Sequence, residues 1–208
     1  MPVLKEVLRN FTFANQLTFL RLVAIPLFII SLFTNRPRLA LAIFMAAGLT
    51  DALDGLIARY LRQTTALGAF LDPLADKLMI TAAFIVLTVP DHPKALPDYI
   101  AANHIPIWLT ILTISRDTFI VITATLLYFV YGIRRFPPTV LGKATTFMEI
   151  VTVLCFLLYN VRGRQADVLI WLSWVTVTLV VASGFHYIYR IGDMVHAAQL
   201  EAGRKIPE

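Results

Sequence analysis

This sequence has little cysteine and few charged residues. Its 208 residues include one cysteine, Cys155, so a disulfide framework and a cysteine-based zinc site within the chain are excluded. The four histidines are dispersed and show no metal-ligand spacing. Charged residues make up 15% of the chain against 58% hydrophobic residues, and the mean hydropathy is +0.74. This composition argues against a soluble domain and is typical of an integral membrane protein.

Other signals are missing as well. The net charge is +5, but the basic residues are scattered and no recognition motif accompanies them, so no nucleic-acid partner is expected. A basic balance suits contact with anionic membrane lipids. Residues 1–16 contain the acidic Glu6 and lack a small-residue cleavage site after an apolar core, so no removable signal peptide is expected.

Long apolar runs predict an all-α integral membrane protein with about six transmembrane helices. Residues 1–14 alternate apolar and charged positions, which predicts a short interfacial helix on the membrane surface. A polar cytoplasmic tail is expected at 192–208, and the length allows a single membrane domain over residues 1–208. The expected spans are 17–33, 39–60, 68–89, 105–131, 140–160 and 168–191.

The distribution of Lys and Arg predicts the orientation. With an even number of spans both termini lie on one side, and the loops of that side hold most of the basic residues. The opposite loops hold Arg36, Arg38, Lys94, Arg162 and Arg164. The positive-inside rule therefore places both termini in the cytoplasm, as in a bacterial inner membrane or an equivalent membrane.

Four aspartates interrupt the second and third spans. An acid at the centre of a membrane helix costs about 2.5–3.5 kcal/mol on insertion scales, so four of them need a compensating partner. Asp51 and Asp54 are three residues apart and Asp72 and Asp76 four apart, so on helices each pair shares a face. Antiparallel packing of the two spans would bring the pairs together. Carboxylates in this number suit Mg²⁺, Mn²⁺ or Ca²⁺ rather than zinc.

The acids belong to a longer string of residues. It resembles the signature of the CDP-alcohol phosphotransferase (phosphatidyltransferase) family, with every defining position filled. The distribution of Lys and Arg places the acids on the cytoplasmic side, where the nucleotide pool lies. The resemblance implies a two-metal centre of Mg²⁺ or Mn²⁺ and commonly a homodimer. The string reads Asp51-x2-Asp54-Gly55-x2-Ala58-Arg59-x8-Gly68-x3-Asp72-x3-Asp76.

The resemblance implies a role for each position of the string. Asp51, Asp54 and Asp72 would ligate metal, and Asp76 would join them and act as the general base on the acceptor hydroxyl. An aspartate needs either a raised pKa or a metal-acidified alcohol for that task, and both routes stay open. The CDP moiety of the donor, CDP-diacylglycerol, would be bound by the intervening residues Gly55, Ala58, Arg59 and Gly68.

The fourth and fifth spans point to the acceptor alcohol. Ser115-Arg116-Asp117 departs from the Ser-Arg-Glu typical of the glycerol-phosphate branches of the family, and Ala124 stands where those branches carry a second arginine. The chain looks closer to the CMP-forming cardiolipin synthase branch, whose acceptor is phosphatidylglycerol, than to the phosphatidylglycerophosphate synthase branch. Arg116 and Lys143 are the expected acceptor contacts, although Arg116 could instead form a structural ion pair with Asp117.

Three alternatives stay open from the sequence. The acceptor could be inositol or another polar alcohol. A small membrane transporter is the competing class, but the two halves of the chain show no duplicated broken helices. Arg21, one turn inside the first span, could reach out to the membrane interface or could face a polar site near a phosphate.

Overall fold

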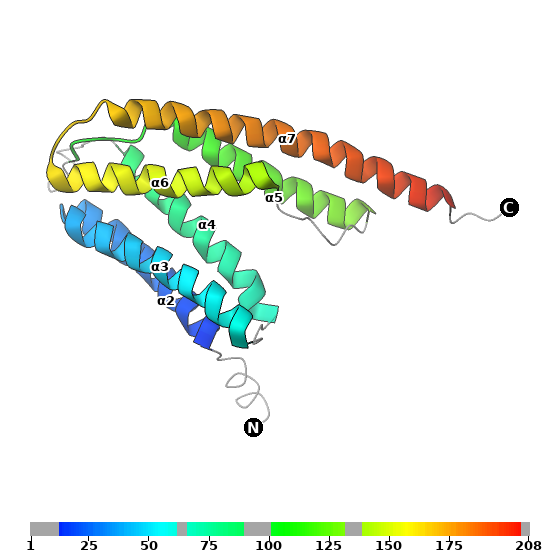
Figure 1. The fold of residues 1–208 in the computed structure, drawn as a ribbon, viewed down its shortest axis with the longest axis horizontal. Helices are drawn as coiled ribbons and strands as arrows, with labels where there is room; N and C mark the ends of the chain where they lie inside the picture. The colour runs from blue at the N-terminus through cyan, green and yellow to red at the C-terminus, as the bar shows by residue number, and fades with distance from the viewer. Residues whose placement is uncertain (1–12, 62–65, 90–100, 132–138, 205–208) are drawn as a thin grey trace, which may run out of the picture. The chain divides into compact units, whose positions relative to one another are not determined.

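The computed structural model describes residues 13–61, 66–89, 101–131 and 139–204, with side chains at 19–50, 75, 77–89, 101–130 and 139–196. Over these residues the protein is entirely α-helical (Figure 1). The six helices are α2 (Phe13–Phe33), α3 (Pro37–Leu61), α4 (Ala66–Thr88), α5 (Ile107–Tyr131), α6 (Val140–Arg162) and α7 (Val168–Arg204).

These bounds agree with the expected all-α fold and differ from the expected spans in one place. Helix α7 does not end near Ile191 but continues to Arg204, a total of 37 residues, through most of the segment expected to be a polar tail. The expected interfacial helix at 1–14 lies almost wholly outside the described residues.

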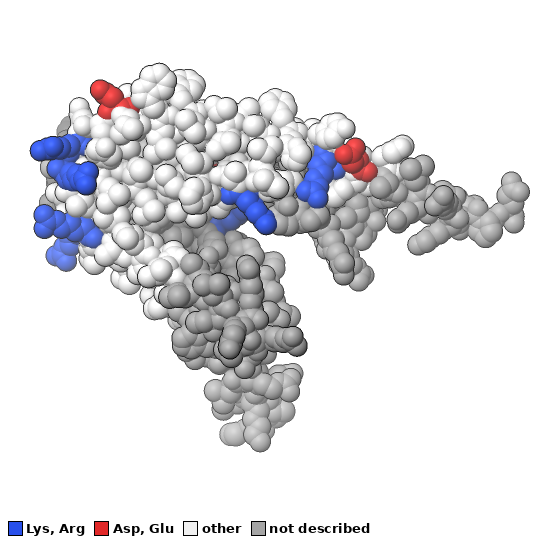
Figure 2. Space-filling model, in the orientation of Figure 1, with Lys and Arg blue, Asp and Glu red and all other residues white. Residues whose placement is uncertain are grey.

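Several helices carry the composition of membrane spans. Three of them are long and apolar enough to cross a bilayer, and no more than 33% of each apolar stretch is buried inside the protein. Phe129 and Trp171 are 78% and 73% exposed, which water would penalise and lipid would not. Charged side chains occupy only a few places on the described surface in Figure 2. The long stretches are Ile107–Val130, Val140–Arg162 and Val168–His196, and shorter apolar helices cover Phe19–Phe33, Pro37–Thr50 and Lys77–Thr88.

The chain divides into two compact units. The first contains residues 1–105 and 153–166, and the second contains residues 106–152 and 167–208. Helix α6 therefore contributes its first part to the second unit and its last part to the first.

Helix α2 is the packing centre of the first unit, because it contacts both α3 and α4. The rings of Phe28 on α2 and Phe44 on α3 are 5.9 Å apart, and both side chains are buried. The turn between α2 and α3 is compact. Asn35 has φ 52°, and the N–H of Arg36 donates to the carbonyl of Ser31 at 2.8 Å, which is the pattern of a Schellman helix end. Pro37 then starts α3, where no backbone donor is needed.

In the second unit α5 and α7 run in the same direction. The rings of Trp108 and Trp174 are 5.0 Å apart near the starts of the two helices, and the hydroxyl of Tyr187 donates to the carbonyl of Ile120 at 3.5 Å further along. Helix α6 runs the opposite way against α7. The Thr145 hydroxyl lies 3.2 Å from the Leu179 carbonyl, and the Thr152 and Thr176 hydroxyls are 2.7 Å apart.

Candidate active site

The two acid pairs lie on helices of the first unit. Asp51 and Asp54 belong to α3, and Asp72 and Asp76 belong to α4, which runs back antiparallel to α3 (Figure 1). The helical spacing that the sequence argument required is therefore present at both pairs. The side chains of the whole string, including Gly55, Ala58, Arg59 and Gly68, lie outside the described residues. Among the side chains that are described, no group of three or more His, Cys, Asp or Glu comes together.

The buried face of α3 leads to the first acid pair. Ala40, Phe44 and Ala47 are all buried, and they are spaced four and then three residues apart. Further steps of four and three residues reach positions 51 and 54. Since steps of three and four residues follow one face of an α-helix, Asp51 and Asp54 occupy positions on the stripe that faces the core of this unit.

The same periodicity holds on α4. Ala75 and Met79 are buried, and position 72 precedes Ala75 by three residues on that stripe. Ile80 is also buried, and position 76 precedes it by four. The positions of both acid pairs therefore continue the buried face of their own helix. Carboxylate oxygens are the kind of ligand that a hard cation such as Mg²⁺ or Mn²⁺ prefers.

Arg21 lies inside the first unit. Its side chain is 3% exposed on α2, the helix that packs against both acid-bearing helices. The sequence left two alternatives for this side chain. Its burial contradicts the one in which it reaches out to the membrane interface.

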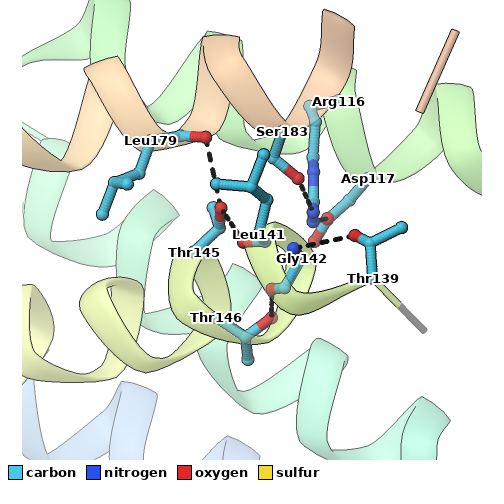
Figure 3. A network of polar contacts seen from close by, with 9 residues as sticks. All are labelled: Arg116, Asp117, Thr139, Leu141, Gly142, Thr145, Thr146, Leu179 and Ser183. Carbon is cyan, nitrogen blue, oxygen red and sulfur yellow. Dashed lines mark hydrogen bonds and ion pairs between the residues drawn. The ribbon is translucent and has the colours of Figure 1, made fainter. Parts of the chain in front are cut away.

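Arg116 is the centre of a polar network in the second unit (Figure 3). Its Nη1 donates to Oδ1 of Asp117 at 2.7 Å, and its Nη2 donates to Oγ of Ser183 on α7 at 2.5 Å. The side chains of Arg116 and Asp117 are 8% and 16% exposed, and Ser183 is buried. The ion pair considered from the sequence is present. Nε of Arg116 is buried and has no hydrogen-bond partner among the described residues.

Two glycines let Arg116 lie close to its neighbours. A Cβ at Gly184 on α7 would lie 3.9 Å from Cγ of Arg116, and a Cβ at Gly142 on α6 would lie 3.4 Å from Nη2. The same added atom at Gly142 would come within 2.9 Å of Oγ1 of Thr139. The guanidinium therefore lies against the first turn of α6.

That first turn is capped. Oγ1 of Thr139 accepts from the N–H of Gly142 at 2.9 Å, and the Thr139 carbonyl accepts from the N–H of Lys143 at 3.1 Å. Thr139 is thus the N-cap of α6, and the helix dipole makes this turn favourable for an anion. The structure brings Arg116 and the turn that carries the exposed Lys143 into one place, and their role as acceptor contacts stays a prediction. Ser183 and Thr139 were not expected, and only the Ser183-Gly184 pair inside an apolar span could have indicated the first.

The fold and these positions define a class. The chain is a helical multi-pass membrane protein with acid positions on inward helix faces and a fixed arginine beside a helix N-terminus. Comparison with known families then gives a specific assignment, because the family described as CDP-alcohol phosphatidyltransferase matches residues 11–181. The chain belongs to this family of enzymes.

Curated relatives cover most of the chain. A protein named "Probable phosphatidylglycerophosphate synthase" of Mycobacterium tuberculosis (strain ATCC 25618 / H37Rv) is 32% identical over 185 residues, which cover 85% of this chain and 80% of that protein. The CDP-diacylglycerol–glycerol-3-phosphate 3-phosphatidyltransferase of Bacillus subtilis (strain 168) is 32% identical over 85% of this chain and 93% of its own length. The human cardiolipin synthase (CMP-forming) is 29% identical over 87% of this chain and 62% of its own length.

Proposed function

We propose that this enzyme transfers a phosphatidyl group from CDP-diacylglycerol to a glycerol-type alcohol and releases CMP in phospholipid biosynthesis. The observation that carries the proposal is the complete acidic string, placed on two antiparallel helices of a chain that belongs to the CDP-alcohol phosphatidyltransferase family.

Two acceptors are candidates. Phosphatidylglycerol is favoured by Asp117 and Ala124, which depart from the pattern of glycerol-phosphate enzymes, and by the likeness to a human cardiolipin synthase. Glycerol 3-phosphate is favoured by relatives whose names state a phosphatidylglycerophosphate synthase or a glycerol-3-phosphate phosphatidyltransferase. Inositol and other polar alcohols have less support.

The family is generally metal-dependent, and the aspartates fit that requirement. Asp51, Asp54, Asp72 and Asp76 would hold one or two ions of Mg²⁺ or Mn²⁺. A bound divalent ion supplies positive charge that stabilises phosphoryl oxygens and the departing CMP. Asp76 accepts the proton of the acceptor hydroxyl, and that oxygen then forms a bond to the lipid-side phosphorus while the bond to CMP breaks.

Other residues of the string bind the donor. Arg59 clamps the diphosphate through its forked N–H groups. Gly55, Ala58 and Gly68 are small, and we assign them to the walls of the CDP site, where backbone must approach the ligand closely.

Arg116 and Lys143 are assigned to the acceptor. Both acceptor candidates carry a phosphate, and the network around Arg116 offers a fixed guanidinium at the N-terminus of α6. The ion pair with Asp117 does not conflict with this role, because it holds the guanidinium in one orientation.

The six helices are assigned to six spans, with both termini and the acidic positions on the cytoplasmic side of a bacterial inner membrane or an equivalent membrane. This assignment rests on the apolar helices and on the excess of Lys and Arg in the loops of that side. A homodimer is the proposed assembly.

The test of the reaction is acceptor-dependent CMP release. Purified protein in detergent is supplied with CDP-diacylglycerol, Mg²⁺ and phosphatidylglycerol or glycerol 3-phosphate. Wild type should release CMP, Asp76→Asn should lose turnover while it still binds CDP, and Asp51→Ala should lose both turnover and metal binding. Asp167→Asn, which changes an exposed acid before α7 in the same way, serves as the matched control and should stay active. Equal CMP release by wild type and Asp76→Asn would contradict the proposal.

The acceptor is decided by lipid analysis. Both alcohols are offered in one reaction, and the products are separated as cardiolipin or phosphatidylglycerophosphate. Cardiolipin as the dominant product supports the phosphatidylglycerol assignment. If neither alcohol gives a product, and CMP is released from CDP-diacylglycerol only when inositol is added, an inositol acceptor would replace both candidates.

A further inference from the structure

Arg21 is a buried cation that the proposed reaction has not used. It lies on α2, inside the apolar stretch Phe19–Phe33, and its side chain is 3% exposed. A charge buried within a membrane helix is costly, and it usually pairs with another charge or with backbone carbonyls, or faces a polar cavity. The elements packed against α2 in this unit are α3 and α4, the helices of the acidic string.

The register of α2 and α3 places Arg21 at one particular acid. The two helices form a tight antiparallel pair, and Phe28 contacts Phe44 across it. Arg21 precedes Phe28 by seven residues, and Asp51 follows Phe44 by seven. Seven residues are nearly two helical turns, so each step returns to the same face after about 10 Å of rise. Position 51 therefore lies at the level of Arg21 on the facing stripe of α3.

We propose that Arg21 is a donor-binding residue whose guanidinium contacts a diphosphate oxygen of the CDP-linked lipid beside Asp51. This inference rests on the proposed function. A nucleotide diphosphate is repelled by four carboxylates, and positive charge at the edge of the acidic site offsets that repulsion. An arginine suits the task because its forked donors match phosphate oxygens and its charge persists when it is buried.

A purely structural role would look different. If Arg21 served only to hold Asp51 in place, its loss would disturb the metal site, and binding of a cation would weaken. If Arg21 contacts the diphosphate, its loss removes a positive charge next to the acids. Cation binding would then stay the same or become tighter, while binding of the diphosphate would weaken.

The experiment measures both ligands separately on the full-length protein in detergent. Mn²⁺ binding without nucleotide is measured by electron paramagnetic resonance, and CDP binding at saturating Mg²⁺ by calorimetry. Arg21→Gln should weaken CDP binding by about 10- to 100-fold, the value of a charge-assisted hydrogen bond, with Mn²⁺ affinity unchanged or higher. Arg36→Gln is the matched control, since Arg36 is an exposed arginine in the turn of the same helix pair, and it should change neither affinity.

Arg21→Lys keeps the charge and covers the case in which the Gln variant does not fold. It should weaken CDP binding by a smaller factor, because the ammonium group lacks the forked geometry. Unchanged CDP affinity in the folded variants, or a parallel loss of Mn²⁺ affinity, would overturn the inference. If wild-type protein nevertheless releases CMP in an acceptor-dependent way, only the inference on Arg21 fails and the proposed function stands. Wild type without CMP release would refute the proposed function itself.

Discussion

Replacement of Gly142 by alanine should change the surroundings of Arg116 while it leaves the stability of the fold nearly unchanged. The new Cβ would lie 2.9 Å from Oγ1 of Thr139, which must therefore shift, and it would lie in close contact with Nη2 of Arg116 at 3.4 Å. Weakening the N-cap bond from Thr139 costs about 1 kcal/mol, and the better helix propensity of alanine returns about the same amount. The free energy of unfolding should therefore change little.

No such compensation is expected in the free energy of acceptor binding. The added methyl group crowds the guanidinium, and a charged contact weakened by about 1 kcal/mol corresponds to about a fivefold higher acceptor KM. Steady-state CMP release at varied acceptor and at varied CDP-diacylglycerol measures the two KM values, and thermal unfolding monitors the fold. Gly184→Ala is the control, because its Cβ would make an ordinary 3.9 Å contact with Arg116. An unchanged acceptor KM in Gly142→Ala, or a rise of the donor KM alone, would refute the assignment of Arg116 to the acceptor.

Four further substitutions test contacts within the units. Ser183→Ala leaves a buried N–H of the Arg116 guanidinium without its acceptor and should raise the acceptor KM about tenfold, whereas Ser173→Ala, which removes a hydroxyl bound within α7, should not. Asn160→Ala removes the amide that accepts the backbone N–H at 103 at 2.8 Å and donates to the carbonyl there at 3.0 Å, and it should lower the free energy of unfolding by about 1–3 kcal/mol in a denaturation curve. Thr152→Val and Thr176→Val, singly and together, should reveal a coupling of about 0.6 kcal/mol in a double-mutant cycle, and purely additive effects would contradict the 2.7 Å contact.

The sequence predicted most of the helices because a membrane helix must satisfy its own backbone over a long apolar run. The helix continues past the predicted end of the last span for a related reason. After Ile191 the composition turns polar, which ends a span, but Ala197, Gln199 and Glu201 favour helix, so the helix outlasts the apolar run to Arg204.

The contents of the site were predictable only in part. The acid positions are local in sequence, so helical spacing alone placed each pair on one face. Burial of Arg21 and the contact between Ser183 and Arg116 depend on which helices pack together, and a periodic pattern does not specify partners that are 67 residues apart. The sequence could therefore pose the alternatives for Arg21 and Arg116, and tertiary packing was needed to show that Arg21 is buried and that Arg116 pairs with Asp117.

The parallel course of α5 and α7 gathers every tryptophan of the protein at one place. Trp108 lies in the first turn of α5, Trp171 and Trp174 lie in the first two turns of α7, and the chain has no other tryptophan. Tryptophan prefers the headgroup level of a bilayer. Intrinsic fluorescence of the unlabelled enzyme is therefore the signal of a single membrane interface, and quenching by lipids brominated at successive acyl positions would measure how deep that end of the second unit lies.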